Sequence, residues 1–318
     1  MKKSLLLALL FFGVQSFCQI TIADNDFPEG GDTALVSISA DFELDFTSSG
    51  ADYVWDYESL TMTEQRIDTF FNVDDASLTY QVVFNNGWLD PDYEADYYTH
   101  FFNFVLPSTE LIPISSPVGF TKIESDKVEI VGVGLEIGGF EVPIKNEIID
   151  VEYELPLTYG DDWVSNSFFE IDLNPVYEGI LRRHQERTSE VDGWGEITTP
   201  FGTFDVVRTV AVLDFTDSLQ FTIGEITTWL ELPTPNQIVY SWWAENQKVP
   251  VLQVVAQDLL GTETVTSVEY KDRYLGDVSI DDIEANVVQL YPNPASDYLQ
   301  INTNQDIDQI DVFTVTGK

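Results

Sequence analysis

The chain has 318 residues, with 14 Lys and Arg against 55 Asp and Glu, so its formal net charge is -41 at pH 7. A surface of this charge repels nucleic acid and anionic membrane faces, so we expect no nucleic-acid partner. The single cysteine excludes an internal disulfide framework, and a chain of this length can be held together by its core alone. The acids are scattered along strand-like segments, which indicates a solubilising coat; divalent cation binding is the alternative.

Residues 1–18 have the three-part pattern of a secretory signal peptide. Two lysines precede an apolar run from Leu5 to Val14, and small and polar residues follow it. The run is about half the roughly 20 residues that a membrane span needs, so we expect no transmembrane segment. We predict cleavage between Cys18 and Gln19. A lipidated Cys18 is the alternative, but a small residue should precede such a cysteine and Phe17 stands there.

Residues 19–275 carry period-two patterns and turn residues, without a sustained helical apolar stripe. We therefore predict an all-β domain, formed by a large twisted antiparallel meander sheet or half-barrel. Tight hairpins are expected at Gly138-Gly139 and around Pro200 and Gly202. From about Thr188 to Tyr274 the pattern predicts five or six neighbouring antiparallel strands. Further hairpin turns are predicted at Asp217-Ser218, Pro233 to Asn236, Glu245 to Lys248, and Leu260-Gly261.

The segment "DPDYEAD" places carboxylates at alternate positions. In an extended loop Asp90, Asp92, Glu94 and Asp96 would lie on one side and form a hard-cation site, so calcium is the cofactor we consider. The segment lacks the glycine and the distal glutamate of an EF-hand loop. An acidic exposed strand or loop is the default interpretation, with no cofactor.

The inventory of nucleophiles and bases disfavours several enzyme classes. The chain has two histidines, no Gly-x-Ser-x-Gly sequence and no cysteine beyond the signal, which excludes the common nucleophilic triads and disfavours zinc. His184 lies among Arg182, Arg183 and Arg187. This basic cluster is either a docking point for a carboxylate or phosphate, or a set of cations paired with nearby acids, and we favour the pairing.

The aromatic residues indicate either a core or a ligand surface. Seven tryptophans, with many Tyr and Phe, could line a sugar-stacking face or an apolar cavity, although core positions are the commoner outcome. Trp242 and Trp243 are adjacent, so on a strand they point to opposite faces. One of them must then face solvent, a second layer or a ligand.

The last part of the chain has a different composition. Residues 276–286 form an acidic segment poor in aromatics, which predicts a linker. Pro292 and Pro294 cannot lie within a central strand and must lead into one, and alternating residues follow in "DYLQINT" and "IDQIDVFTVTG". Two strands cannot form a core of their own, so we expect residues 287–318 to be part of a larger β-sandwich module.

This tail resembles the type A C-terminal sorting domain of the type IX secretion system of Bacteroidota. The resemblance rests on Tyr291, Pro292, Asn293 and Pro294, on the strand from Ala295 to Ile301, and on an aspartate- and threonine-rich run ending in Gly-Lys. It covers residues 287–318. It implies an Ig-like sandwich of which these residues form only a part, export through the type IX secretion machinery as partner, and a secreted or cell-surface location.

The body resembles exported Bacteroidota β-proteins and, more remotely, the half-barrels of lipoprotein-carrier-like folds, over about residues 153–255. That similarity implies a curved sheet and transfers no ligand-contact residues. We favour a non-enzymatic binding or surface module for a small apolar or glycan ligand. The alternative is a secreted carbohydrate-active hydrolase that works through two carboxylates, which 55 acids leave unassigned.

Overall fold

The computed structural model describes residues 19–102, 104, 114–174, 178–223, 226–259, 262–273, 289–291 and 300–302. The chain divides into two compact units, Met1–Arg273 and Tyr274–Lys318. The predicted signal peptide, the predicted linker and most of the predicted sorting motif lie outside the described residues. In the second unit β15 (Gln289–Tyr291) pairs antiparallel with β16 (Gln300–Asn302).

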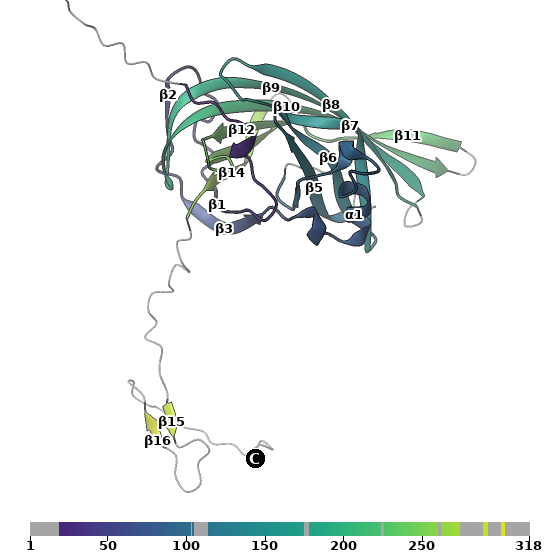
Figure 1. Ribbon diagram of the computed structural model, residues 1–318, viewed down its shortest axis with the longest axis horizontal. Helices are drawn as coiled ribbons and strands as arrows, with labels where there is room; N and C mark the ends of the chain where they lie inside the picture. Colours follow the sequence, from purple (N-terminus) through teal and green to yellow (C-terminus); the bar gives the residue numbers. More distant parts are fainter. Residues whose placement is uncertain are drawn as a thin grey trace, which may run out of the picture. The chain divides into compact units, whose positions relative to one another are not determined.

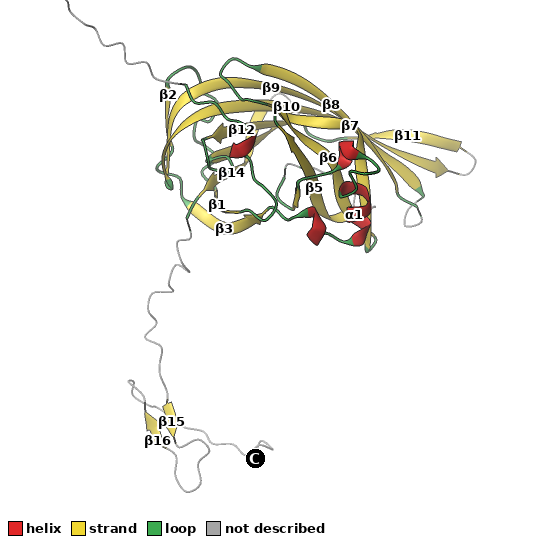
Figure 2. Ribbon diagram, viewed as in Figure 1, coloured by secondary structure: helices red, strands yellow, loops and turns green. Residues whose placement is uncertain are grey.

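The first unit is built almost wholly of strands, which confirms the all-β prediction (Figure 2). Within the described residues the exceptions are a two-turn helix, α1 (Leu78–Phe84), and the 3-10 turns η1 (Asp24–Asp26), η2 (Val73–Asp75) and η3 (Pro91–Tyr93). The strands are β1 (Thr33–Ser39), β2 (Tyr53–Asp56), β3 (Met62–Thr69), β4 (Tyr97–Thr99), β5 (Ile114–Glu124), β6 (Lys127–Ile137), β7 (Phe140–Glu154), β8 (Asp162–Asp172), β9 (Gly179–Thr199), β10 (Gly202–Ile223), β11 (Ile226–Leu232), β12 (Gln237–Trp243), β13 (Leu252–Leu259) and β14 (Thr262–Lys271).

These strands form one rolled sheet that is nearly closed. Its order is β3-β1-β14-β13-β12-β10-β9-β8-β7-β6-β5-β4, with β11 added beside β10 and β2 parallel to β9. The two outer strands of this order come together through a single bridge, in which Phe71 and Tyr98 exchange backbone hydrogen bonds of 2.9 and 3.0 Å. The sheet therefore rolls into a barrel-like wall, and β9 and β10 arch along one side of it (Figure 1).

Most of the predicted hairpins are confirmed. Gly138 and Gly139 join β6 to β7 with φ angles of 58° and 86°, a conformation that favours glycine. The turn after Pro200 joins β9 to β10, and residues 245–248 lie between the paired strands β12 and β13. Leu260-Gly261 lies outside the described residues, between Leu259 and Thr262, which pair with each other.

Two predicted hairpins are wrong. β10 runs straight through Asp217-Ser218, because Asp217 lies opposite Arg183 in the ladder and its carboxylate accepts two hydrogen bonds from that guanidinium, at 2.8 and 2.7 Å. Residues 233–236 join β11 to β12, but both of those strands pair with β10, along different parts of it. The turn-forming residues Asp217 and Ser218 suggested that a strand ends there, whereas β10 continues for 22 residues, from Gly202 to Ile223.

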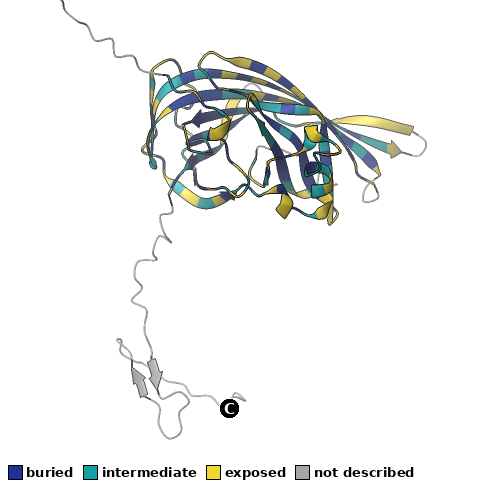
Figure 3. Cartoon of the chain, viewed as in Figure 1, coloured by how far each residue is buried: buried dark blue, intermediate teal, exposed yellow. Residues whose placement is uncertain are grey.

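The two faces of the rolled sheet bury different neighbours. Trp242 is fully buried on the outer face, in a cluster with Phe46, Trp55 and Tyr57 from the segment that covers this end of the sheet. Trp243 points inward and packs on Phe27 at a ring-centroid distance of 4.5 Å. The prediction that these adjacent residues serve opposite faces is confirmed. Figure 3 shows the alternation of buried and exposed positions along β9 and β10, and the exposed β11.

Helix α1 packs against the other half of the sheet, where two glycines make room for it. A Cβ atom on Gly132 would come within 2.5 Å of the Phe84 ring, and one on Gly134 within 2.7 Å of the Tyr80 ring. Phe84 in turn stacks on Phe120 of β5 at 4.0 Å. The alternating glycines of β6 thus let the helix approach the sheet more closely than any side chain would permit.

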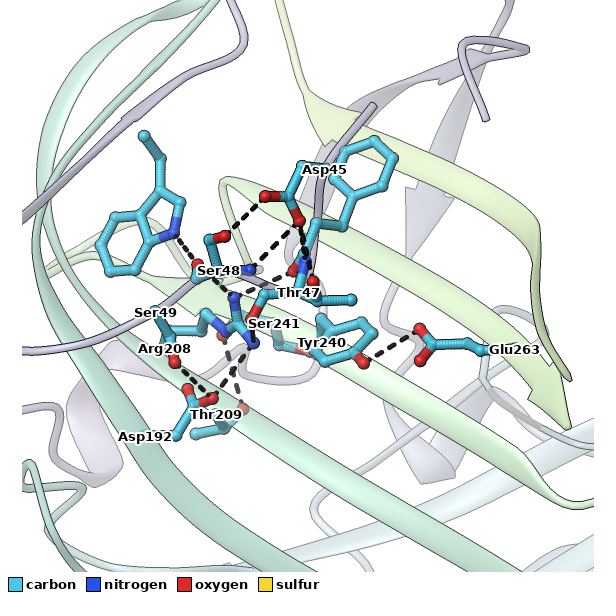
Figure 4. A network of polar contacts seen from close by, with 12 residues as sticks. Asp45, Thr47, Ser48, Ser49, Asp192, Arg208, Thr209, Tyr240, Ser241 and Glu263 are labelled. Atoms are coloured by element: carbon cyan, nitrogen blue, oxygen red, sulfur yellow. Dashed lines mark hydrogen bonds and ion pairs between the residues drawn. The ribbon is translucent and has the colours of Figure 1, made fainter. Parts of the chain in front are cut away.

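A buried arginine fastens the covering segment to the outer face (Figure 4). Arg208 of β10 donates hydrogen bonds of 2.9, 2.8 and 3.1 Å to the backbone carbonyls of Phe46, Ser48 and Thr47. It also pairs with Asp192 of β9 at 3.1 Å. Because the guanidinium satisfies three carbonyls of one loop, we interpret this network as a structural clasp.

Candidate functional site

A cavity of about 430 Å³ lies inside the rolled sheet, between its two ends. One side of the wall comes from β3, β1, β14, β13 and β12, and the other from β4, β5, β6 and β7. Segments between strands complete it. The lining side chains include aromatic residues and charged residues, together with aliphatic and small polar residues and His100. The aromatic residues are Phe27, Phe70, Tyr97, Phe101, Phe102, Phe104, Tyr153, Trp243 and Tyr270, and the charged residues are Arg66, Asp68, Glu152, Lys248, Glu269 and Lys271.

Arg66 gathers two of the carboxylates on the β3 side of the cavity. Its guanidinium donates hydrogen bonds of 2.6 and 3.2 Å to Asp68 and of 3.0 and 2.5 Å to Glu269. Phe101 covers the guanidinium at 4.7 Å. Burial works against the positive charge, yet the hydrogen bonds from Arg66 to Glu269 and Asp68 raise the pKa of Arg66, so it stays charged. Both carboxylates are therefore engaged within the protein.

The two lysines of the lining are held by loop carbonyls. Lys248 donates 3.1 Å hydrogen bonds to the carbonyls of Asn25 and Phe27, and Lys271 donates to the carbonyl and side-chain oxygens of Gln247 at 2.6 and 3.0 Å. Burial lowers the pKa of Lys271. These contacts tie the β12–β13 loop to the N-terminal segment and to β14, which closes this end of the cavity.

Glu152 differs from the other charged groups of the lining. Tyr153 pairs with Val128 and Val151 pairs with Glu129, so Glu152 is the extra residue of a β-bulge, a feature that redirects a side chain. Within the described part of the chain its carboxyl group makes no hydrogen bond. Burial raises the pKa of Glu152, Arg187 lowers it, and the neighbouring carboxylate of Asp150 raises it further.

Polar and aromatic groups surround the Glu152 side of the cavity. Burial and the charge of Glu152 both raise the pKa values of Tyr97 and Tyr153, which line the same space. Tyr153 packs on Phe27 at 5.3 Å and edge-on to Trp243 at 5.4 Å. Gln237 also lines the cavity, and its buried Oε1 atom has no partner among the described residues. The site thus offers aromatic faces beside unpaired polar atoms.

The basic cluster predicted around His184 is a set of ion pairs. Arg187 pairs with Asp150 at 2.7 Å and Arg183 with Asp217 at 2.7 Å, both deep inside, while Arg182 pairs with Glu170 near the surface. His184 is exposed on the outer face and stacks against Phe168 at 4.4 Å. The pairing interpretation is confirmed. The structural reason is that Arg183 and Arg187 of β9 point inward, where they meet Asp217 of the adjacent strand β10 and Asp150 of β7, two strands away.

The predicted calcium ligands lie on a turn, and two of them have other partners. Residues 91–93 form the 3-10 turn η3, so the four carboxylates do not project from an extended loop. Asp90 forms an ion pair with Lys145, and Asp96 accepts a 2.6 Å hydrogen bond from the backbone of Ile123. Across the described residues no three His, Cys, Asp or Glu side chains are grouped as metal ligands. Calcium binding here stays a prediction.

Sequence reasoning missed the residues of the cavity. Arg66, Glu152 and Glu269 stand among other charged residues of strands that alternate like their neighbours, and Arg66 and Glu269 are 203 residues apart. The β-bulge at Glu152 marks one of these residues, but it can be recognised only when the pairing of β6 with β7 is known. Of the seven tryptophans that the sequence suggested as part of a ligand surface, Trp243 lines the cavity.

Comparison with known proteins identifies the tail. The family model of the secretion system C-terminal sorting domain matches residues 289–318, which confirms the predicted resemblance of the tail to the type IX sorting domain. No curated protein and no solved structure matches the chain. Among the helices that the structure describes, none is long and apolar enough to cross a membrane.

The tail and the fold together define the class of protein. The chain is an exported cargo of the type IX secretion system, secreted or held at the cell surface, and its body is an antiparallel, barrel-like β domain.

Proposed function

We propose that residues 19–273 act as a non-enzymatic binding module that encloses a small ligand in the cavity of the rolled sheet. The observation that carries the proposal is the cavity of about 430 Å³, in which aromatic rings stand beside unpaired polar groups. Ligand pockets commonly have volumes of about 300–1,000 Å³ and combine apolar walls with a few polar groups that orient the ligand.

The lining favours a ligand with an apolar body and several hydrogen-bonding groups, such as a glycan fragment. Aromatic rings can stack on the apolar faces of a sugar ring. A plain acyl chain would leave Glu152 and the Oε1 atom of Gln237 facing hydrocarbon. Each buried polar group left without a partner costs about 1–3 kcal/mol, which works against a purely apolar ligand.

Glycoside hydrolysis, the alternative, receives less support from this site. That reaction needs two available carboxyl groups, about 5 to 9.5 Å apart. In the cavity Asp68 and Glu269 are both bound by Arg66, which leaves Glu152 as the carboxyl group without a hydrogen bond among the described lining residues. Binding therefore accounts for the arrangement better than hydrolysis.

Calorimetric titration with glucose, glucosamine, choline and 3,3-dimethylbutan-1-ol tests the proposal. At least one probe should bind in a 1:1 ratio with a Kd of about 1 mM or tighter. Thr266 lines the cavity but is exposed, so Thr266→Trp narrows the site without removing a core side chain and should abolish binding. Thr264→Trp, on the same strand and outside the lining, is the matched control and should bind normally.

Two results would overturn the proposal. One is the absence of binding by every probe, and the other is equal binding by the Thr266→Trp variant. Release of reducing sugar from an oligosaccharide by the purified protein would instead support the hydrolase.

A further inference from the structure

The charged side chains of the cavity differ in whether they have a partner within the protein, and this difference indicates the class of ligand. Arg66 is balanced by Asp68 and Glu269, and Lys248 lies 3.3 Å from Glu29. Lys271 donates to two oxygens of Gln247. Glu152 faces the same space without a hydrogen bond from any described residue. It is therefore the charged group of the lining that a ligand is best placed to satisfy.

The nearest cation does not neutralise Glu152. Arg187 influences it electrostatically, but the Arg187 guanidinium already donates two hydrogen bonds to Asp150, of 3.1 and 2.7 Å. Asp150 is itself a negative charge close to Glu152. Because Arg187 is hydrogen-bonded to Asp150, the side of Glu152 that faces the cavity has no positively charged group from the described residues bound to it.

The surroundings of Glu152 suit a positive charge for a second reason. Tyr97 and Tyr153 lie within electrostatic range of its carboxyl group, and Phe27 and Trp243 pack on Tyr153. The faces of aromatic rings attract cations, and the attraction is stronger when the contact is desolvated. The net charge of -41 also raises the local concentration of small cations around the protein and lowers that of anions.

From these contacts we infer that the ligand is a small organic cation whose ammonium group faces Glu152 while its body packs among the aromatic rings. An anionic ligand would meet an unpaired carboxylate, and a neutral ligand would cover the charge of Glu152 without balancing it. An amino sugar or a quaternary amine has the required chemistry. This inference rests on the proposed function, because it specifies the ligand of the same cavity.

Matched pairs of probes that differ in charge test the inference at pH 8. Choline is compared with 3,3-dimethylbutan-1-ol, which has the same shape without the charge, and glucosamine is compared with glucose. We expect the cation of at least one pair to bind at least tenfold more tightly than its neutral counterpart. Glu152→Gln should reduce that preference at least tenfold. Glu154→Gln, which alters an exposed acid on the same strand, should leave it unchanged.

The outcomes separate this inference from the proposed function. If neutral and cationic probes bind equally, or if Glu152→Gln keeps the preference for the cation, the inference is overturned while the binding function stands. If no probe binds, or if binding survives Thr266→Trp, both are overturned. The near-isosteric Glu152→Gln change preserves shape, and the circular dichroism spectrum of each variant is compared with that of the unchanged protein before titration.

Discussion

At the scale of single residues, the interior of the barrel is unusual in burying charges. Arg183–Asp217 and Arg187–Asp150 are ion pairs of which both members are almost fully buried, and each pair links neighbouring or nearby strands of the sheet. Paired charges of this kind contribute little net stability, whereas a single buried charge without its partner is costly. The pairs therefore constrain which substitutions the barrel tolerates.

Replacing Asp150 with Asn should destabilise the domain by about 3–5 kcal/mol, because it removes the carboxylate that accepts two hydrogen bonds from the buried Arg187 guanidinium. The matched control is Glu170→Gln, which breaks the surface pair with Arg182 and should cost about 0–1 kcal/mol. Urea unfolding of both variants measures the difference. Equal losses of unfolding free energy would show that the interior pair is no more important than the surface pair.

Glu152 should make the stability of the domain depend on pH. Its pKa is raised in the folded state, so the unfolded chain loses this proton first, and the contribution of Glu152 is fully present below its ordinary pKa of 4.5. That contribution is lost as pH rises towards the folded pKa. The groups that face it are Asp150, Arg187, Tyr97 and Tyr153.

We expect Glu152→Gln to be more stable than the unchanged protein at pH 7 and to lose this advantage as pH falls to 4. Thermal unfolding at a series of pH values measures the difference between the two proteins. Subtracting one curve from the other removes the effect of the titrating groups that do not interact with Glu152. A difference that stays constant with pH would contradict the raised pKa.

At the scale of elements, the contact between α1 and β6 depends on glycine. Gly134→Ala would place a methyl group 2.6 Å from the Val118 side chain and 2.7 Å from the Tyr80 ring. We expect a loss of about 1–3 kcal/mol, as is usual when a well-packed region is overfilled.

A double-mutant cycle assigns that loss to the helix. Tyr80→Ala alone removes a buried ring and should cost about 3–5 kcal/mol. When Gly134→Ala is added, the alanine methyl group no longer meets the Tyr80 ring and keeps only its close contact with Val118, so the double variant should be less destabilised than the sum of the single variants. Additive losses in urea unfolding would mean that Tyr80 does not limit the space beside Gly134.

At the scale of the whole molecule, the chain separates a folded body from a sorting tail. Every cluster of buried side chains in the described residues lies between positions 22 and 270. Residues 19–273 alone should therefore fold, with a melting temperature within about 2 °C of that of the full chain. A difference of 1 kcal/mol would already shift the transition of a domain this size by about that amount. A larger drop would show that residues 274–318 stabilise the body.

A different truncation, which removes residues 289–318 and keeps residues 1–18, tests the sorting role of the tail. In a bacterium with type IX machinery, the chain without residues 289–318 should stay inside the cell envelope, and the full chain serves as the comparison. Equal amounts of both proteins outside the cell would contradict the role of the tail.

The sequence alone determined the class of fold and the route of export. Alternation of apolar and polar residues and the glycine turn at positions 138–139 are local patterns, so they predict strands and hairpins directly. The sorting motif is a contiguous run of residues and needs no tertiary structure to be recognised. The same locality explains the error at Asp217-Ser218, where turn-forming residues lie in a long strand because Arg183 on the neighbouring strand engages Asp217.

Only the tertiary structure decided where the cavity lies and which residues line it. The sheet brings β3 and β4 together through one bridge, and this closure places Arg66, Glu152 and Glu269 around a common space. The alternation along a strand predicts which of its residues lie on the same face of the sheet. It does not predict which strand lies beside it, because that depends on how the entire sheet rolls. The partners of each charge follow from that closure, and so does the lack of a hydrogen-bond donor to Glu152 among the described residues.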